Sequence, residues 1–113
     1  GLVSFKYHPE FFGYLVNNDK VSAFQFIQRI HESGVDLEHF TKDFIEYLRK
    51  VLMSKVNPAT LTAVGEDPVQ NWQVDGVRMI KMINVFTSAR NEIKTSPIVQ
   101  LPLELAVLEL VQQ

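Results

Sequence analysis

The sequence predicts an all-α domain, a mostly antiparallel bundle of about five helices. Apolar residues recur at intervals of three and four along most of the chain, which is the spacing of an amphipathic helix. No stretch alternates apolar and polar residues as a half-buried strand would. The 113 residues, 46% of them hydrophobic, suffice for one compact domain and are too few for two. Residues 1–113 are therefore expected to form a single helical domain.

The first two helices are expected in the N-terminal third of the chain. His8-Pro9 is typical of a helix entrance, because the missing proline N–H is not needed in the first turn. Asn17-Asn18-Asp19 ends this helix, and Asp19 is expected to cap the next one, which runs from about Lys20 to Ser33. Gly34 then provides a left-handed stop.

The third helix has the clearest pattern. Asp36 caps it, and apolar residues keep helical spacing from Leu37 to Val56. At 1.5 Å per residue this is a rod of roughly 30 Å. Asn57-Pro58 ends it, and residues 57–67 form the one long connector, in which we consider a short turn at Thr60–Val64.

The last two helices are the most apolar. The fourth begins between Pro68 and Asp75, with a start near Asp75 favoured, and its wide apolar face predicts neighbours on two sides. Pro97 stops this helix by about Lys94, and Pro102 suits the first turn of the fifth helix. The fifth helix is apolar on nearly all sides, so it must be enclosed by the core or by another chain. We expect it to be the central post of the bundle.

Composition excludes several classes of protein. The net charge of −2 and a pI near 5.9 give no global attraction to nucleic acid. The absence of cysteine excludes a disulfide framework or a thiolate metal site and fits a reducing compartment. No apolar run is long enough to span a membrane, and no signal peptide is recognisable. The chain begins with Gly1 rather than Met, which suggests a piece of a longer protein.

The histidines suggest a metal site only weakly. His31 and His39, together with Asp36 and Glu38, supply suitable ligand types. Their spacing crosses a helix break and lacks the i, i+4 histidine pair that holds zinc on one helix face. We therefore interpret them as solvated polar residues at a helix–helix corner.

No arrangement of residues predicts catalysis in this fragment. Glu104 and Glu109 are five residues apart on the last helix, so they lie on different faces and do not form an acid–base pair. The serine and threonine hydroxyls lack an elbow motif and a histidine partner. The glycines are isolated and no phosphate-binding loop occurs, so we expect no ATP site of the P-loop kind.

Two features suggest nucleic acid, but each has a simpler interpretation. Arg78, Lys81, Arg90 and Lys94 recur along the fourth helix and would suit phosphates, yet a solvated or inter-subunit face fits the negative net charge better. Trp72 would suit stacking on a base, but a tryptophan that covers the edge of the core is the favoured interpretation.

Ordered motifs along nearly the whole chain resemble one family. They are N-N-D-K-V-S-A-F at 17–24, G-V-D-L-E-H-F at 34–40, Y-L-R-K-V-L-M-S-K at 47–55 and F-T-S-A-R-N-E-I-K-T-S-P-I-V-Q-L-P-L-E-L-A-V-L-E-L at 86–110. Their order and spacing are similar to those of the third domain of bacterial DNA polymerase III subunits gamma and tau. The connector with Lys-x-Ser-Pro and the helix with Leu-Glu-Leu-Ala are the closing features of that domain.

The resemblance implies a function in clamp loading. Gamma and tau are the ATPase subunits of the machine that opens the sliding clamp and places it on primed DNA. Their first two domains form the AAA+ motor, where ATP and zinc are expected, and the third is a helical collar that holds the subunits in a ring. The resemblance thus implies an oligomerisation domain without a cofactor, whose partners are copies of itself and the delta and delta-prime subunits.

The surplus of large apolar residues also indicates self-association or a partner. The contact is expected to draw on the fourth and fifth helices, with Glu92 among the charged residues at its rim. The residues assigned to the subunit interface are Met82, Phe86, Arg90, Ile93, Lys94, Leu103, Glu104, Val107 and Leu110. The alternative is a helical adaptor or regulatory domain that binds a partner peptide in a groove beside the fourth helix, without catalysis.

Overall fold

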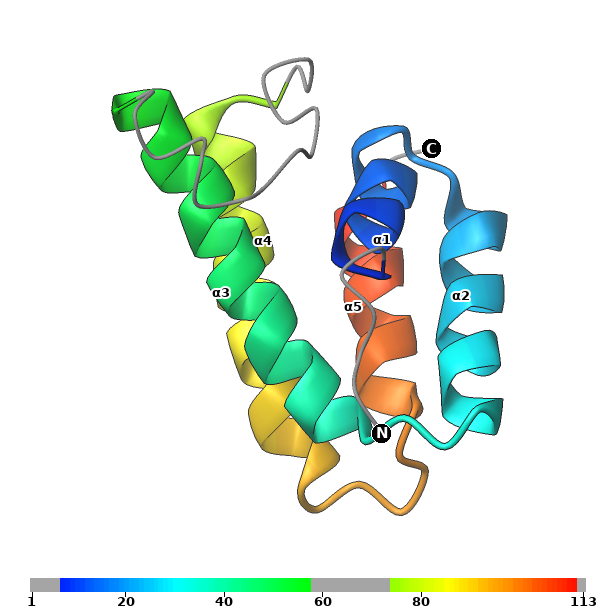
Figure 1. The fold of residues 1–113 in the computed structure, drawn as a ribbon. Coiled ribbons are helices and arrows are strands. Elements are labelled where there is room, and N and C mark those ends of the chain that lie inside the picture. Colours follow the sequence, from blue (N-terminus) through cyan, green and yellow to red (C-terminus); the bar gives the residue numbers. More distant parts are fainter. Residues whose placement is uncertain (1–6, 58–73, 112–113) are drawn as a thin grey trace.

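Five helices make up the part of the chain that the structure describes. The structure is a computed structural model, and it describes residues 7–57 and 74–111 (Figure 1). The helices are α1 (Tyr7–Val16), α2 (Lys20–Glu32), α3 (Leu37–Val56), α4 (Gly76–Ile93) and α5 (Leu101–Leu110). No strand occurs in these two ranges. The predicted all-α bundle is confirmed, and the helix boundaries agree with the sequence patterns to within a residue or two.

The helices pack in a chain of neighbours around α5. The two longest helices, α3 and α4, pack against each other, and α5 packs against α4 beside this pair (Figure 1). α2 packs against α5 on the side away from α4, and α1 packs against α2 and lies in front of α5 in this view. α5 is thus placed between the α3–α4 pair and α2, as the sequence predicted for its central post.

Aspartates fix the starts of three helices. The side-chain oxygens of Asp19, Asp36 and Asp75 accept hydrogen bonds from backbone N–H groups three residues later, at 3.2, 3.1 and 2.8 Å. Each carboxylate satisfies a donor that has no partner within the helix and lies at the positive end of the helix dipole. The cap at Asp75 also decides the start of α4, which the sequence placed between Pro68 and Asp75.

Gly34 ends α2 as predicted. Its φ of +85° lies in the left-handed region, where a Cβ atom is unfavourable. The N–H of Gly34 donates to the carbonyl of His31 and the N–H of Val35 donates to that of Ile30, each at 3.1 Å. This pattern satisfies the last carbonyls of the helix and turns the chain toward α3.

Aromatic side chains from four helices form the centre of the core. The ring of Phe11 on α1 stacks on Phe26 of α2, with centroids 4.8 Å apart, and lies 5.0 Å from Phe44 of α3. Phe86 of α4 meets Phe44 edge to face at 5.1 Å. Such contacts add about 0.5–1.5 kcal/mol each beyond the burial of apolar area. The four helices are thereby tied to one another through a single cluster.

Two predictions concern the segment between α3 and α4. The turn considered at Thr60–Val64 and the position of Trp72 lie outside the described residues.

The wide apolar face of α4 is covered by α3 and α5 on two sides, as expected. Ile80 on the same helix nevertheless remains 53% exposed.

Candidate subunit interface

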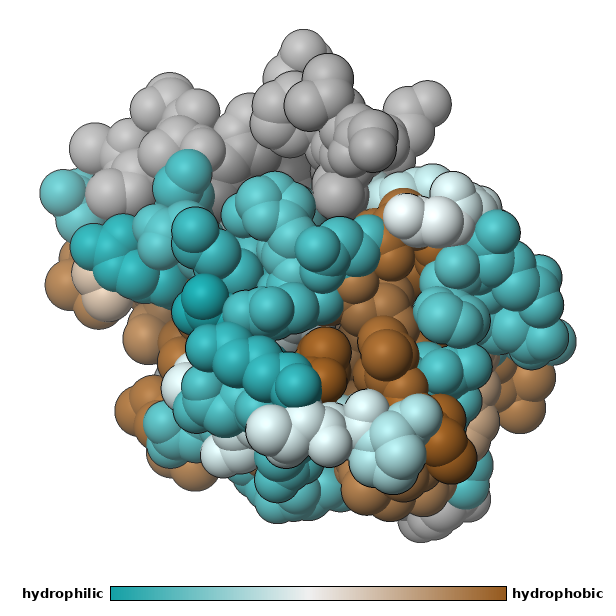
Figure 2. Space-filling model, turned by 90° about the horizontal axis from the view of Figure 1, so that it is seen from below, coloured by the Kyte–Doolittle hydropathy of each residue, from teal (hydrophilic) through white to brown (hydrophobic). Residues whose placement is uncertain are grey.

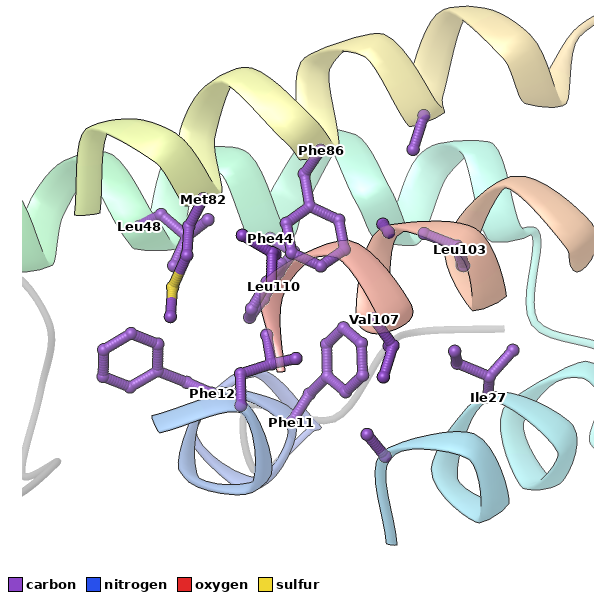
Figure 3. Close-up of a cluster of buried hydrophobic side chains, with 14 of the residues drawn as sticks. Phe11, Phe12, Ile27, Phe44, Leu48, Met82, Phe86, Leu103, Val107 and Leu110 are labelled. Carbon is purple, nitrogen blue, oxygen red and sulfur yellow. The ribbon is translucent and has the colours of Figure 1, made fainter. Parts of the chain in front are cut away.

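Six of the nine residues assigned to the subunit interface belong to the core of this protomer. Their side chains are at most 7% exposed, and they are Met82, Phe86, Ile93, Leu103, Val107 and Leu110. Figure 3 shows five of them converging with side chains from α1, α2 and α3 in one apolar cluster. They cannot contact a second subunit in this conformation, so the sequence-based assignment is corrected for these six.

For Leu103, Val107 and Leu110, the composition of α5 explains why the sequence did not place them in the core. Helical spacing normally separates a buried face from a solvated one, but α5 carries apolar residues on almost every side. Sequence alone therefore could not show which of its residues point inward. In the structure, Leu103 and Val107 face the core, whereas Leu105 and Leu108 are each 51% exposed.

The three charged residues of the assignment lie at the surface. The guanidinium of Arg90 and the ammonium of Lys94, at the end of α4, each lie 3.8 Å from the carboxylate of Glu38 on α3. These ion pairs are half-exposed, so each adds little to stability. Glu104 is half-buried on α5. Whether these three residues contact another subunit stays a prediction.

A shallow groove runs between α4 and α5. Its volume is about 240 Å³, and its lining residues are Asn84, Val85, Ser88, Ala89 and Glu92 from α4 with Pro102, Leu105, Ala106 and Glu109 from α5. Small and apolar side chains line its middle, while Glu92 and Glu109 place an exposed carboxylate on each wall. The groove thus combines an apolar middle with an acidic side chain on each wall.

The exposed apolar residues continue from α5 into the connector that precedes it. Ile98 is 52% exposed and Val99 is 39% exposed, and both lie in the link between α4 and α5 at the lower end of the molecule in Figure 1. Seen from that end, apolar atoms reach the surface between polar ones (Figure 2). Apolar side chains exposed next to one another on a folded protein are typical of contact surfaces.

The basic stripe of α4 is partly used within the protomer. Arg78 donates to the carbonyl oxygens of Leu15 and Val16 at 2.8 and 3.2 Å and to the side-chain oxygen of Asn18 at 2.8 Å. With Arg90 and Lys94 near Glu38, three of the four cations have partners in the same chain. The stripe is thus no continuous row of uncommitted cations for phosphates.

The histidines do not gather. Within residues 7–57 and 74–111, no three metal-ligating side chains come together. His39 lies 3.3 Å from Asp43 on the same helix, and His31 is exposed on α2.

No helix within residues 7–57 and 74–111 has the length and hydropathy needed to cross a membrane.

Comparison with known families agrees with the motifs in the sequence. The family model described as "DNA polymerase III subunits gamma and tau domain III" matches residues 1–113, the full length of the chain. No curated protein and no solved structure matches the chain significantly. The resemblance seen in the sequence is therefore confirmed at the level of the family.

Proposed function

This chain belongs to the family of domain III of DNA polymerase III subunits gamma and tau, and from this premise we propose that it is an oligomerisation domain of the clamp loader. In this proposal it acts as the collar that holds the loader subunits together while the clamp is opened and placed on DNA. ATP hydrolysis and zinc binding would belong to motor domains upstream, and the site of action would be the bacterial cytoplasm. Its partners would be copies of this chain and the delta and delta-prime subunits.

The observation that supports this proposal most is the exposed side of α5. Leu105 and Leu108 lie half-exposed on a helix whose other side is in the core, and Leu105 also borders the groove beside α4. Each side chain left exposed to water loses roughly 1–2 kcal/mol of the hydrophobic stabilisation that full burial would give. A contact with a sister subunit would recover that free energy, and a collar needs a persistent contact of this kind.

Measuring molecular mass over a range of concentrations tests the proposal. The wild-type chain should associate with itself or with delta and delta-prime, and Leu105→Ser/Leu108→Ser should weaken that association. Val21→Ser is the matched control, because Val21 is 63% exposed on α2, away from the α4–α5 groove. A wild-type chain that stays monomeric and ignores delta and delta-prime would contradict the proposal.

The groove also supports a second candidate function. A helical adaptor would bind an amphipathic peptide between α4 and α5, with apolar side chains against Val85 and Leu105. In that case the chain alone would remain monomeric, and a peptide rather than a clamp-loader subunit would protect the groove. The same mass measurement, repeated with clamp-loader subunits, therefore separates the two functions.

A further inference from the structure

We draw no further inference here: the strongest candidate, the apolar surface patch of Val77 and Ile80 on the exposed side of α4, is an unpartnered helix face, and nothing in the described part of the structure shows what covers it.

Discussion

At the scale of single residues, Arg78 joins two parts of the chain that are distant in sequence. Its guanidinium lies near the start of α4 and donates to the last carbonyls of α1 and to Asn18 in the turn that follows. Those carbonyls have no partner within their own helix, and the cation also lies at the negative end of the α1 dipole. The sequence pattern placed Arg78 on a solvated or inter-subunit stripe, because spacing along one helix cannot reveal a partner about sixty residues away.

Replacing Arg78 should therefore destabilise the domain. Arg78→Met is expected to lower the free energy of unfolding by about 2 kcal/mol, since it removes charge-assisted hydrogen bonds to the Leu15 and Val16 carbonyls and to Asn18. Urea denaturation measures this change. Lys81→Met, at an exposed position one turn further along α4, is the control and should change stability by less than about 0.5 kcal/mol.

His8 is a largely enclosed histidine, and its surroundings predict that stability depends on pH near neutrality. Its ring packs at 5.4 to 6.1 Å from those of Phe40, Phe44 and Tyr47, and its Nε2 atom makes no hydrogen bond with the described protein. Burial lowers the pKa of His8 below its usual 6.5, and the nearby charge of Asp43 opposes this only in part. The unfolded chain therefore binds this proton more readily than the folded one.

Stability should consequently fall as the pH drops below about 6.5. A histidine whose pKa is lowered by folding contributes its full stability at pH values above its pKa in the unfolded chain. This contribution is lost as the pH falls toward its pKa in the folded chain, and the free energy of unfolding then changes by at most about 1.4 kcal/mol per pH unit. Urea denaturation at about pH 7.5 and pH 5.5 measures the loss. His8→Phe should show a smaller loss, whereas His31→Gln, at an exposed site, should behave like wild type. Equal losses in all three proteins would exclude His8 as the source.

At the scale of elements, local chemistry explains why the helix boundaries were predictable. Three aspartates cap helix starts by accepting a hydrogen bond from the N–H group three residues later; they are Asp19, Asp36 and Asp75. Gly34 ends α2 through its own backbone conformation. Such signals need no knowledge of the rest of the fold. Which side of α5 is buried is a different matter, because it depends on the helices that surround it. Its apolar sequence therefore showed that the helix is covered without showing on which sides.

The two described glycines at helix ends should respond oppositely to alanine. Gly34→Ala is expected to cost about 1 kcal/mol, because φ is +85° there even though no atom lies within 4 Å of the new Cβ. Gly76→Ala, in the first turn of α4 with equally open surroundings, should gain about 0.5 kcal/mol from helix propensity. Thermal unfolding of the two variants measures both changes in stability, the loss at Gly34 and the gain at Gly76. A gain at Gly34 would show that the left-handed stop is not needed.

At the scale of the whole molecule, the core and the proposed contact surface use opposite sides of the same helices. The core of the protomer includes Met82, Phe86 and Leu103, whereas the groove side of α4 and the outer side of α5 are exposed to solvent. The sequence predicted the class of fold and the family, because both follow from patterns along the chain. It could not separate core residues from those of the proposed contact surface, since both sets include large apolar side chains.

The rate of thiol alkylation on the outer side of α5 tests the central claim most directly. The chain has no cysteine, so Leu108→Cys and Val21→Cys each introduce a single exposed thiol. If sister subunits cover α5, alkylation of Leu108→Cys should slow as protein concentration rises, and alkylation of Val21→Cys should not. Equal and concentration-independent rates at both positions would contradict the account.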